Sequence, residues 1–245
     1  MALISHRSDD GFLFACEGSV INSRYVLTAA VCIANKNTVG VRVGEFDLRY
    51  ETERGNNTRS FICIFILQDI QVEAAIVHEN FEGHPKYVND IGLIRLASHI
   101  NFSYKNAGKM CLPITKELRQ GSLENKVATV AGWGVADMTK ELTVISKTVV
   151  TVYTKDECIS YSRNTLELDY ANLGYREICA GTCLKDACNL DSGIPLMLEG
   201  RYNNVLSYIQ YGILSNGIGN CRKHTPKFYT AVSPFMLWIL DNIKE

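Results

Sequence analysis

Apolar and polar residues alternate over several short stretches of this chain, as they do in strands with one buried face. Val39, Val41 and Val43 alternate with polar or small residues before a glycine. Residues 127–131, 144–152 and 205–214 are rich in valine, isoleucine, leucine and threonine. Turn residues separate these stretches at short intervals. The pattern predicts many short strands, with no internal repeat and no low-complexity segment.

A helix is predicted only at the end of the chain, over residues 233–245. Ser233 is a suitable N-cap and Pro234 fits the first helical position. Phe235, Trp238, Ile239 and Ile243 follow at helical spacing and form an inward stripe. Many short strands followed by one terminal helix indicate an all-β protein built from antiparallel barrels.

The composition of the chain argues against several functional classes. The chain has 245 residues, is 47% hydrophobic and carries a net charge of −1. It can bury a large core as one domain, and it lacks the positive charge that nucleic acids or anionic membranes require. The longest apolar run, residues 61–67, is far short of the roughly 20 residues of a membrane span. Nine cysteines indicate an oxidising compartment, where Asn56 and Asn101 would accept glycans.

Three segments carry the candidate chemistry. Residues 25–32 read YVLTAAVC, residues 89–96 read NDIGLIRL, and residues 188–195 read CNLDSGIP. Together they resemble the trypsin/chymotrypsin-like serine protease family (peptidase S1) along nearly the whole chain. The resemblance implies two six-stranded antiparallel barrels, over residues 1–115 and 116–232, with a site in the cleft between them and the terminal helix at 233–245. We expect the first strand to be cut short.

The resemblance implies a damaged catalytic triad. In the family the first segment reads TAAHC and its histidine is the general base, but Val31 stands there in this chain. Asp90 and Ser192 match the family's aspartate and nucleophile, and we interpret both as vestigial. Loss of the base costs such a triad about 10⁶ in kcat. Of the five histidines, His78 lies where the family often has a structural one, and none of the others lies in a catalytic-looking segment.

The resemblance also implies altered neighbours of the nucleophile. Leu190 and Ile194 replace glycines at the oxyanion hole and behind the nucleophile. The substrate-binding positions are Asp186, Leu190, Ser215, Gly217 and Lys227, with Asp186 at the pocket floor. Lys227 replaces a pocket glycine, so it either reaches Asp186 or extends to solvent. Asp191 would lack the freed amino terminus with which the family carboxylate pairs.

The family pattern pairs the cysteines as Cys16–Cys32, Cys158–Cys179 and Cys188–Cys221, leaving Cys63, Cys111 and Cys183. Cys111 matches the cysteine that tethers the catalytic domain to a prodomain. Cys63 and residues 43–47 look most like arthropod clip-domain members. The first residues are not a signal peptide, so either an upstream segment is missing or the protein is never secreted. We favour a missing upstream segment and expect a secreted protein.

These features favour a catalytically inactive serine protease homologue, a cofactor or regulator in an extracellular proteolytic cascade of innate immunity or melanisation. Its partners would be cascade proteases or their substrates, with no cofactor, metal, nucleic acid or membrane. The alternative is a trypsin-like serine endopeptidase with residual activity. A third interpretation, supported by the unpaired cysteines, is a product that does not fold stably.

Overall fold

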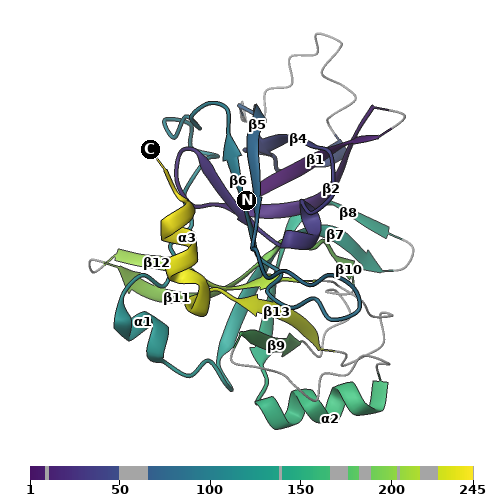
Figure 1. The fold of residues 1–245 in the computed structure, drawn as a ribbon, viewed down its shortest axis with the longest axis vertical. Helices are drawn as coiled ribbons and strands as arrows, with labels where there is room; N and C mark the ends of the chain where they lie inside the picture. Colours follow the sequence, from purple (N-terminus) through teal and green to yellow (C-terminus); the bar gives the residue numbers. More distant parts are fainter. Residues whose placement is uncertain are drawn as a thin grey trace.

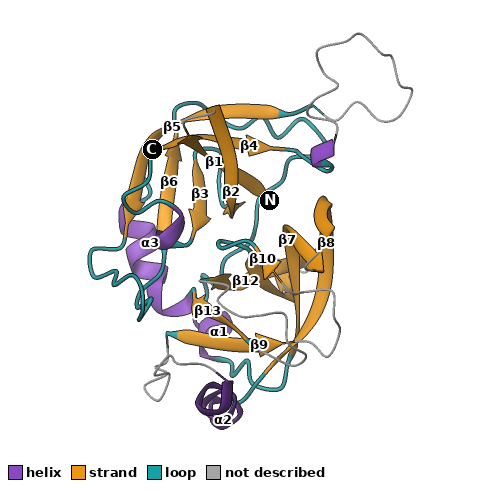
Figure 2. Ribbon diagram, turned by 90° about the vertical axis from the view of Figure 1, so that its right-hand side faces the viewer, coloured by secondary structure: helices purple, strands orange, loops and turns teal. Residues whose placement is uncertain are grey.

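The computed structural model describes residues 1–8, 11–49, 66–137, 140–165, 176–181, 189–202, 205–215 and 226–244 (Figure 1). The strands fall into two antiparallel sheets that follow one another along the chain. Figure 2 shows the first sheet in the upper half of the molecule and the second in the lower half. The expected all-β architecture of antiparallel barrels is therefore confirmed.

The first sheet is a closed barrel of six strands. Its strands lie in the order β1 (Ala2–Ser8), β2 (Gly11–Val20), β3 (Tyr25–Thr28), β6 (Gly92–Leu96), β5 (Gln68–Val77) and β4 (Thr38–Val43). The expectation of a first strand cut short stays a prediction. Strand β1 pairs with β2 on one side and with β4 on the other, so it closes the barrel.

The second sheet contains a ring of six strands and one short addition. The order is β10 (Asn189–Leu190), β7 (Val127–Asp137), β11 (Pro195–Tyr202), β12 (Val205–Leu214), β13 (Lys227–Ala231), β9 (Glu177–Gly181) and β8 (Lys140–Val152). Pairing between β7 and β8 returns the sheet upon itself. The four predicted strand segments correspond to β4, β7, β8 and β12.

The helical segments are short: η1 (Ala30–Cys32), α1 (Lys116–Gln120), α2 (Lys155–Thr165), η4 (Ser233–Phe235) and α3 (Met236–Asn242). The C-terminal helix thus starts with a 3₁₀ turn, and the predicted N-cap was wrong because Ser233 lies inside that turn, whose N-cap position is Val232. Among the described residues, no helix has the length and apolarity to span a membrane.

Each sheet encloses its own hydrophobic core. Leu27, Leu93 and Ile94 are fully buried in the first, and Leu196 and Ile209 are buried in the second. Burial of each such side chain contributes about 1.5–3 kcal/mol. The C-terminal segment bonds to the second barrel through the Val232 N–H and the Tyr211 carbonyl, and then crosses to the first. Its buried side chains Val232, Phe235, Met236 and Ile239 join the core of the first barrel, and so tie the end of the chain to its beginning.

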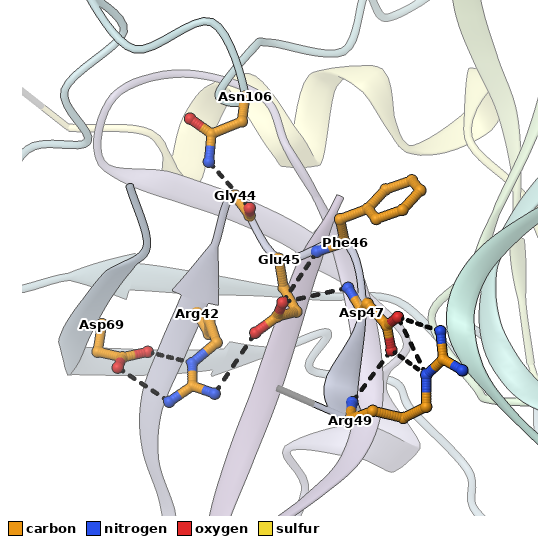
Figure 3. A network of polar contacts seen from close by, with 8 residues as sticks. All are labelled: Arg42, Gly44, Glu45, Phe46, Asp47, Arg49, Asp69 and Asn106. Carbon is orange, nitrogen blue, oxygen red and sulfur yellow. Dashed lines mark hydrogen bonds and ion pairs between the residues drawn. The ribbon is translucent and has the colours of Figure 1, made fainter. Parts of the chain in front are cut away.

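Figure 3 shows the network of polar contacts in the loop that follows β4. The carboxylate of Glu45 accepts hydrogen bonds from the backbone N–H groups of Phe46 at 3.0 Å and Asp47 at 3.2 Å. This geometry presents the carbonyl of Phe46 to the N–H of Ile145 on β8, at 3.0 Å. Asp47 forms an isolated antiparallel bridge with Val144 on the same strand. The loop therefore fixes the first barrel against β8 of the second.

Candidate functional site

Val31 and Asp90 meet at one end of the first barrel. Val31 lies in the 3₁₀ turn η1, directly after the buried strand β3, and Asp90 immediately precedes β6. Because the last residue of β3, Thr28, pairs with the first residue of β6, Gly92, the two flanking segments come together. The backbone N–H of Val31 donates a hydrogen bond of 2.7 Å to Oδ1 of Asp90. The isopropyl side chain packs against the first core.

Asp90 is fully buried, with 0% exposure. Burial raises the pKa of its carboxyl, and hydrogen bonds from Ser215, Val31 and Ala30 oppose that rise. The hydroxyl of Ser215, at the end of β12, donates to Oδ2 at 2.5 Å. A buried carboxylate is costly unless donors of this kind satisfy it. An amide N–H and a hydroxyl now occupy both oxygens, and neither group can take a proton from a serine.

The backbone around Asp90 is held on both sides. Asn89 adopts a left-handed conformation with φ of 53°, and its side-chain oxygen accepts a hydrogen bond of 2.6 Å from Arg176. The Asn89 amide nitrogen donates to the carbonyl of Asn80 at 2.8 Å. Thr230 of β13 donates to the Asp90 carbonyl at 2.9 Å. Residues of both barrels therefore fix the position of this carboxylate.

Ser192 lies in a tight turn between β10 and β11. Gly193 has φ of +94°, and its N–H donates to the Leu214 carbonyl at 2.8 Å. A β-carbon at Gly193 would approach the Glu17 carbonyl to 1.9 Å, so only glycine fits. The Ser192 carbonyl accepts the Glu17 N–H at 2.9 Å and lies 3.4 Å from Sγ of Cys32. The structure thus brings Ser192 to the edge of the first barrel, beside the turn that carries Val31.

Glu17 is a site residue that the sequence did not single out. It lies on β2 next to Cys16, is 0% exposed, and accepts the Trp133 backbone N–H at 2.7 Å through Oε1. Its own carbonyl accepts the Thr28 hydroxyl at 2.6 Å. A glutamate in a strand next to a cysteine carries no signal of burial. The Glu17 carboxyl fits beside Gly132 and its carbonyl fits beside Gly193, because neither glycine of the other barrel has a side chain.

The replacements beside the nucleophile are accommodated differently. Ile194 is fully buried in the second core, where its side chain occupies the space over Gly132. A β-carbon at Gly132 would lie 2.4 Å from Ile194, so the small residue on β7 compensates for the large one. Leu190 pairs with Gly134 through β10 and β7. The expected disturbance of an oxyanion hole by Leu190 stays a prediction.

Only part of the predicted substrate-binding pocket lies within the described residues. Lys227 is the first residue of β13 and is 8% exposed, which disfavours the alternative in which it extends into solvent. Asp186 and Gly217 lie outside the described residues, and the Lys227–Asp186 ion pair remains a prediction. Asp191 is half-buried, and burial raises the pKa of its carboxyl.

Two of the histidines are engaged in structural contacts. His78 is 7% exposed and packs its ring against Phe235 and Trp238, at centroid distances of 5.2 and 5.1 Å. These contacts agree with its structural interpretation. His6 of β1 lies nearer to the site, and its Nε2 is 2.7 Å from the carbonyl of Cys32. Because a carbonyl only accepts, that nitrogen carries the proton and cannot serve as a base.

Two predicted disulfides, Cys16–Cys32 and Cys158–Cys179, are present. The first joins β2 to η1 and so braces the segment that carries Val31. Cys111 has a free, half-buried thiol among the described residues. The other four cysteines, including the predicted Cys188–Cys221 pair, and the sequon at Asn56 lie outside the described residues. Asn101 is exposed.

Comparisons with known proteins agree with this architecture. The chain is 33% identical to the CLIP domain-containing serine protease HP8 of Bombyx mori over its full length, and spans 66% of that relative. It is 34% identical to phenoloxidase-activating factor 3 of Holotrichia diomphalia, with 100% of this chain and 68% of the relative covered. The crystal structure of the Drosophila Grass clip serine protease of the Toll pathway superposes with a TM-score of 0.79 at 26% identity. That superposition covers 98% of this chain and 67% of Grass. The Trypsin family model matches residues 1–239, and the chain belongs to this family.

Proposed function

We propose that this chain is a catalytically inactive serine protease homologue that acts by binding other proteins. The observation that carries the proposal is the environment of Asp90. Its carboxylate is bonded to the Val31 N–H and the Ser215 hydroxyl, in a segment where the family places a histidine. A serine hydroxyl is a weak nucleophile until an adjacent base takes its proton. Asp90 and Ser192 therefore remain as parts of the fold.

The relatives suggest where such a protein acts. Their names describe clip-domain proteases, a phenoloxidase-activating factor and a protease of the Toll pathway. We infer an extracellular role as cofactor or regulator in a proteolytic cascade of innate immunity or melanisation. Cascade proteases or their substrates would be the partners. Cys111 would be the attachment point of a prodomain, because its half-buried thiol is free among the described residues.

The alternative function is a trypsin-like endopeptidase with residual activity. The ordered turn at Ser192 and the intact bonding of its Gly193 favour it, because these features present the nucleophile in an active relative. Without a base, however, such a site exceeds uncatalysed hydrolysis by only about 10³–10⁴. This rate is too low for a working protease.

Hydrolysis of Arg and Lys peptide substrates separates the two functions. The purified chain should show no turnover above that of its Ser192→Ala variant, and no labelling by a fluorophosphonate probe. Turnover that disappears in the variant would overturn the proposal. A cooperative thermal unfolding transition of the same sample would exclude the third interpretation, in which the chain does not fold stably. For the regulatory role, adding the chain to insect plasma should change phenoloxidase activity, whereas a heat-denatured sample should not.

A further inference from the structure

The carboxyl group of Glu17 is buried at the junction of the two barrels, and the proposed function gives it no role. Its Oε1 accepts the backbone N–H of Trp133, but its Oε2 has no hydrogen-bond partner within the described part of the chain. An ionised carboxylate with one unsatisfied oxygen and 0% exposure is costly. A protonated carboxyl avoids most of this cost, because it is neutral.

Glu17 also connects the two barrels through its backbone. Its N–H donates to the Ser192 carbonyl, and its own carbonyl packs against Gly193. Its side chain reaches Trp133 and the space over Gly132 on β7. One residue of the first barrel therefore contacts both the nucleophile turn and the neighbouring strand of the second. A change in the charge of Glu17 acts on both segments at once.

Among the described residues, the charged side chain that acts on Glu17 is Asp191, in the same turn as Ser192, and it raises the pKa of Glu17. The other groups against it are neutral: the Thr28 hydroxyl of β3, the backbone N–H of Trp133 on β7, and Ile194 just before β11. Burial is the largest cause and holds the pKa of Glu17 well above its usual range. The nearby Asp191 adds to it as a like charge.

We propose that Glu17 is a pH-sensitive latch between the barrels. While the Glu17 carboxyl is protonated, the Ser192–Gly193 turn stays packed against the first barrel. When the carboxyl ionises, the turn becomes more mobile. On ionisation the proton passes to solvent, and the new charge lies beside Asp191 with one oxygen unsatisfied. Admission of water to that oxygen requires movement of the turn or of β7. The presentation of the Ser192 face to a partner then depends on pH.

The sign of the stability effect follows from linkage. A carboxyl whose pKa is raised in the folded state binds more protons there than in the unfolded chain. Its contribution to stability is therefore present at low pH. That contribution is lost as pH rises from the usual glutamate range through the folded-state pKa.

Trp133 offers a direct reporter of the latch. The chain has two tryptophans, so Trp238→Phe leaves Trp133 as the only one. In this background we expect the Trp133 emission to shift in one transition as pH is raised from 5 to 9. Amide exchange of the peptide containing Ser192 and Gly193 should rise several-fold over the same range. Both changes should be absent in Glu17→Gln, which mimics the protonated form.

Asp191→Asn is the matched control, because it removes the neighbouring like charge and should move the transition to lower pH. The shift of the transition in Asp191→Asn tests the role of the Glu17 charge even if Glu17→Gln does not fold. His6 and His78 are retained in all variants, so their titration cannot mimic the difference. A transition that persists unchanged in Glu17→Gln would overturn the proposal. Emission and exchange that stay flat in the parent, or an Asp191→Asn transition that does not move, would do the same.

Discussion

The backbone N–H of Val31 lies 2.7 Å from Oδ1 of Asp90 and donates a hydrogen bond to it. This bond keeps the turn after β3 attached to the segment before β6, although no imidazole connects them. The turn that carries Val31 and the segment that carries Asp90 are therefore held together without a histidine at position 31. Under the proposed function, Ser192 lacks a group that can take its proton. Variants at these positions separate structural from catalytic roles.

Val31→His should restore little hydrolysis of Arg or Lys substrates. Leu190 and Ile194 remain beside the nucleophile, and Lys227 remains buried in the strand that borders the predicted pocket. Loss of a single oxyanion-hole donor alone costs about 10²–10³ in kcat. We expect kcat/KM to stay at least that far below an ordinary trypsin-like enzyme. The Val31→His/Ser192→Ala double variant gives the background. Activity at the level of an intact relative would show that the base is the sole defect.

Ser215→Ala should destabilise the protein, because it removes the hydroxyl bonded to the buried Asp90 carboxylate. A hydrogen bond to a charged group contributes about 1.5–3 kcal/mol, and one between neutral groups about half as much. Burial raises the pKa of Asp90, so its contribution to stability falls as pH rises from the usual aspartate range through the folded-state value. The loss in Ser215→Ala should therefore be larger at pH 7 than at pH 4.

Urea unfolding at both pH values measures this difference. Ser233→Ala is the matched control, since the Ser233 side chain caps no helix and its removal should cost little. An equal loss for Ser215→Ala at both pH values would mean that the hydroxyl stabilises something other than the Asp90 charge.

The sequence predicted the barrels well because their signal is local. Alternating valines mark β4, and β-branched runs mark β8 and β12, so each strand is visible in its own residues. The terminal helix was predicted with the wrong start, because Ser233 and Pro234 form a 3₁₀ turn rather than a capped α-helix. The burial of Glu17 was not predictable in this way. It depends on Gly132 and Gly193, which are more than a hundred residues away in the chain and meet Glu17 only after the barrels pack.

Removal of the Cys16–Cys32 bridge by a double substitution to alanine should lower stability by about 2–4 kcal/mol, as expected for loss of a native disulfide. The bridge closes a segment of 16 residues that contains β3 and the turn with Val31. Cys111→Ser, which alters a thiol that is free among the described residues, is the control and should change the melting temperature little. Thermal unfolding under non-reducing conditions compares the three proteins. Equal melting temperatures would show that the bridge contributes nothing.

Benzamidine, a small cation that mimics an arginine side chain, should not bind the parent chain. Lys227 is 8% exposed at the start of β13, so its side chain is directed into the protein. If its ammonium pairs with Asp186, as the sequence predicts, it occupies the place of a substrate cation. Lys227→Gly should then open the pocket and allow binding, seen as a rise in melting temperature with benzamidine. Adding Asp186→Asn to that variant should abolish the rise, because the carboxylate is the expected ligand. Binding of benzamidine to the parent at micromolar concentration would show that Lys227 leaves the pocket open.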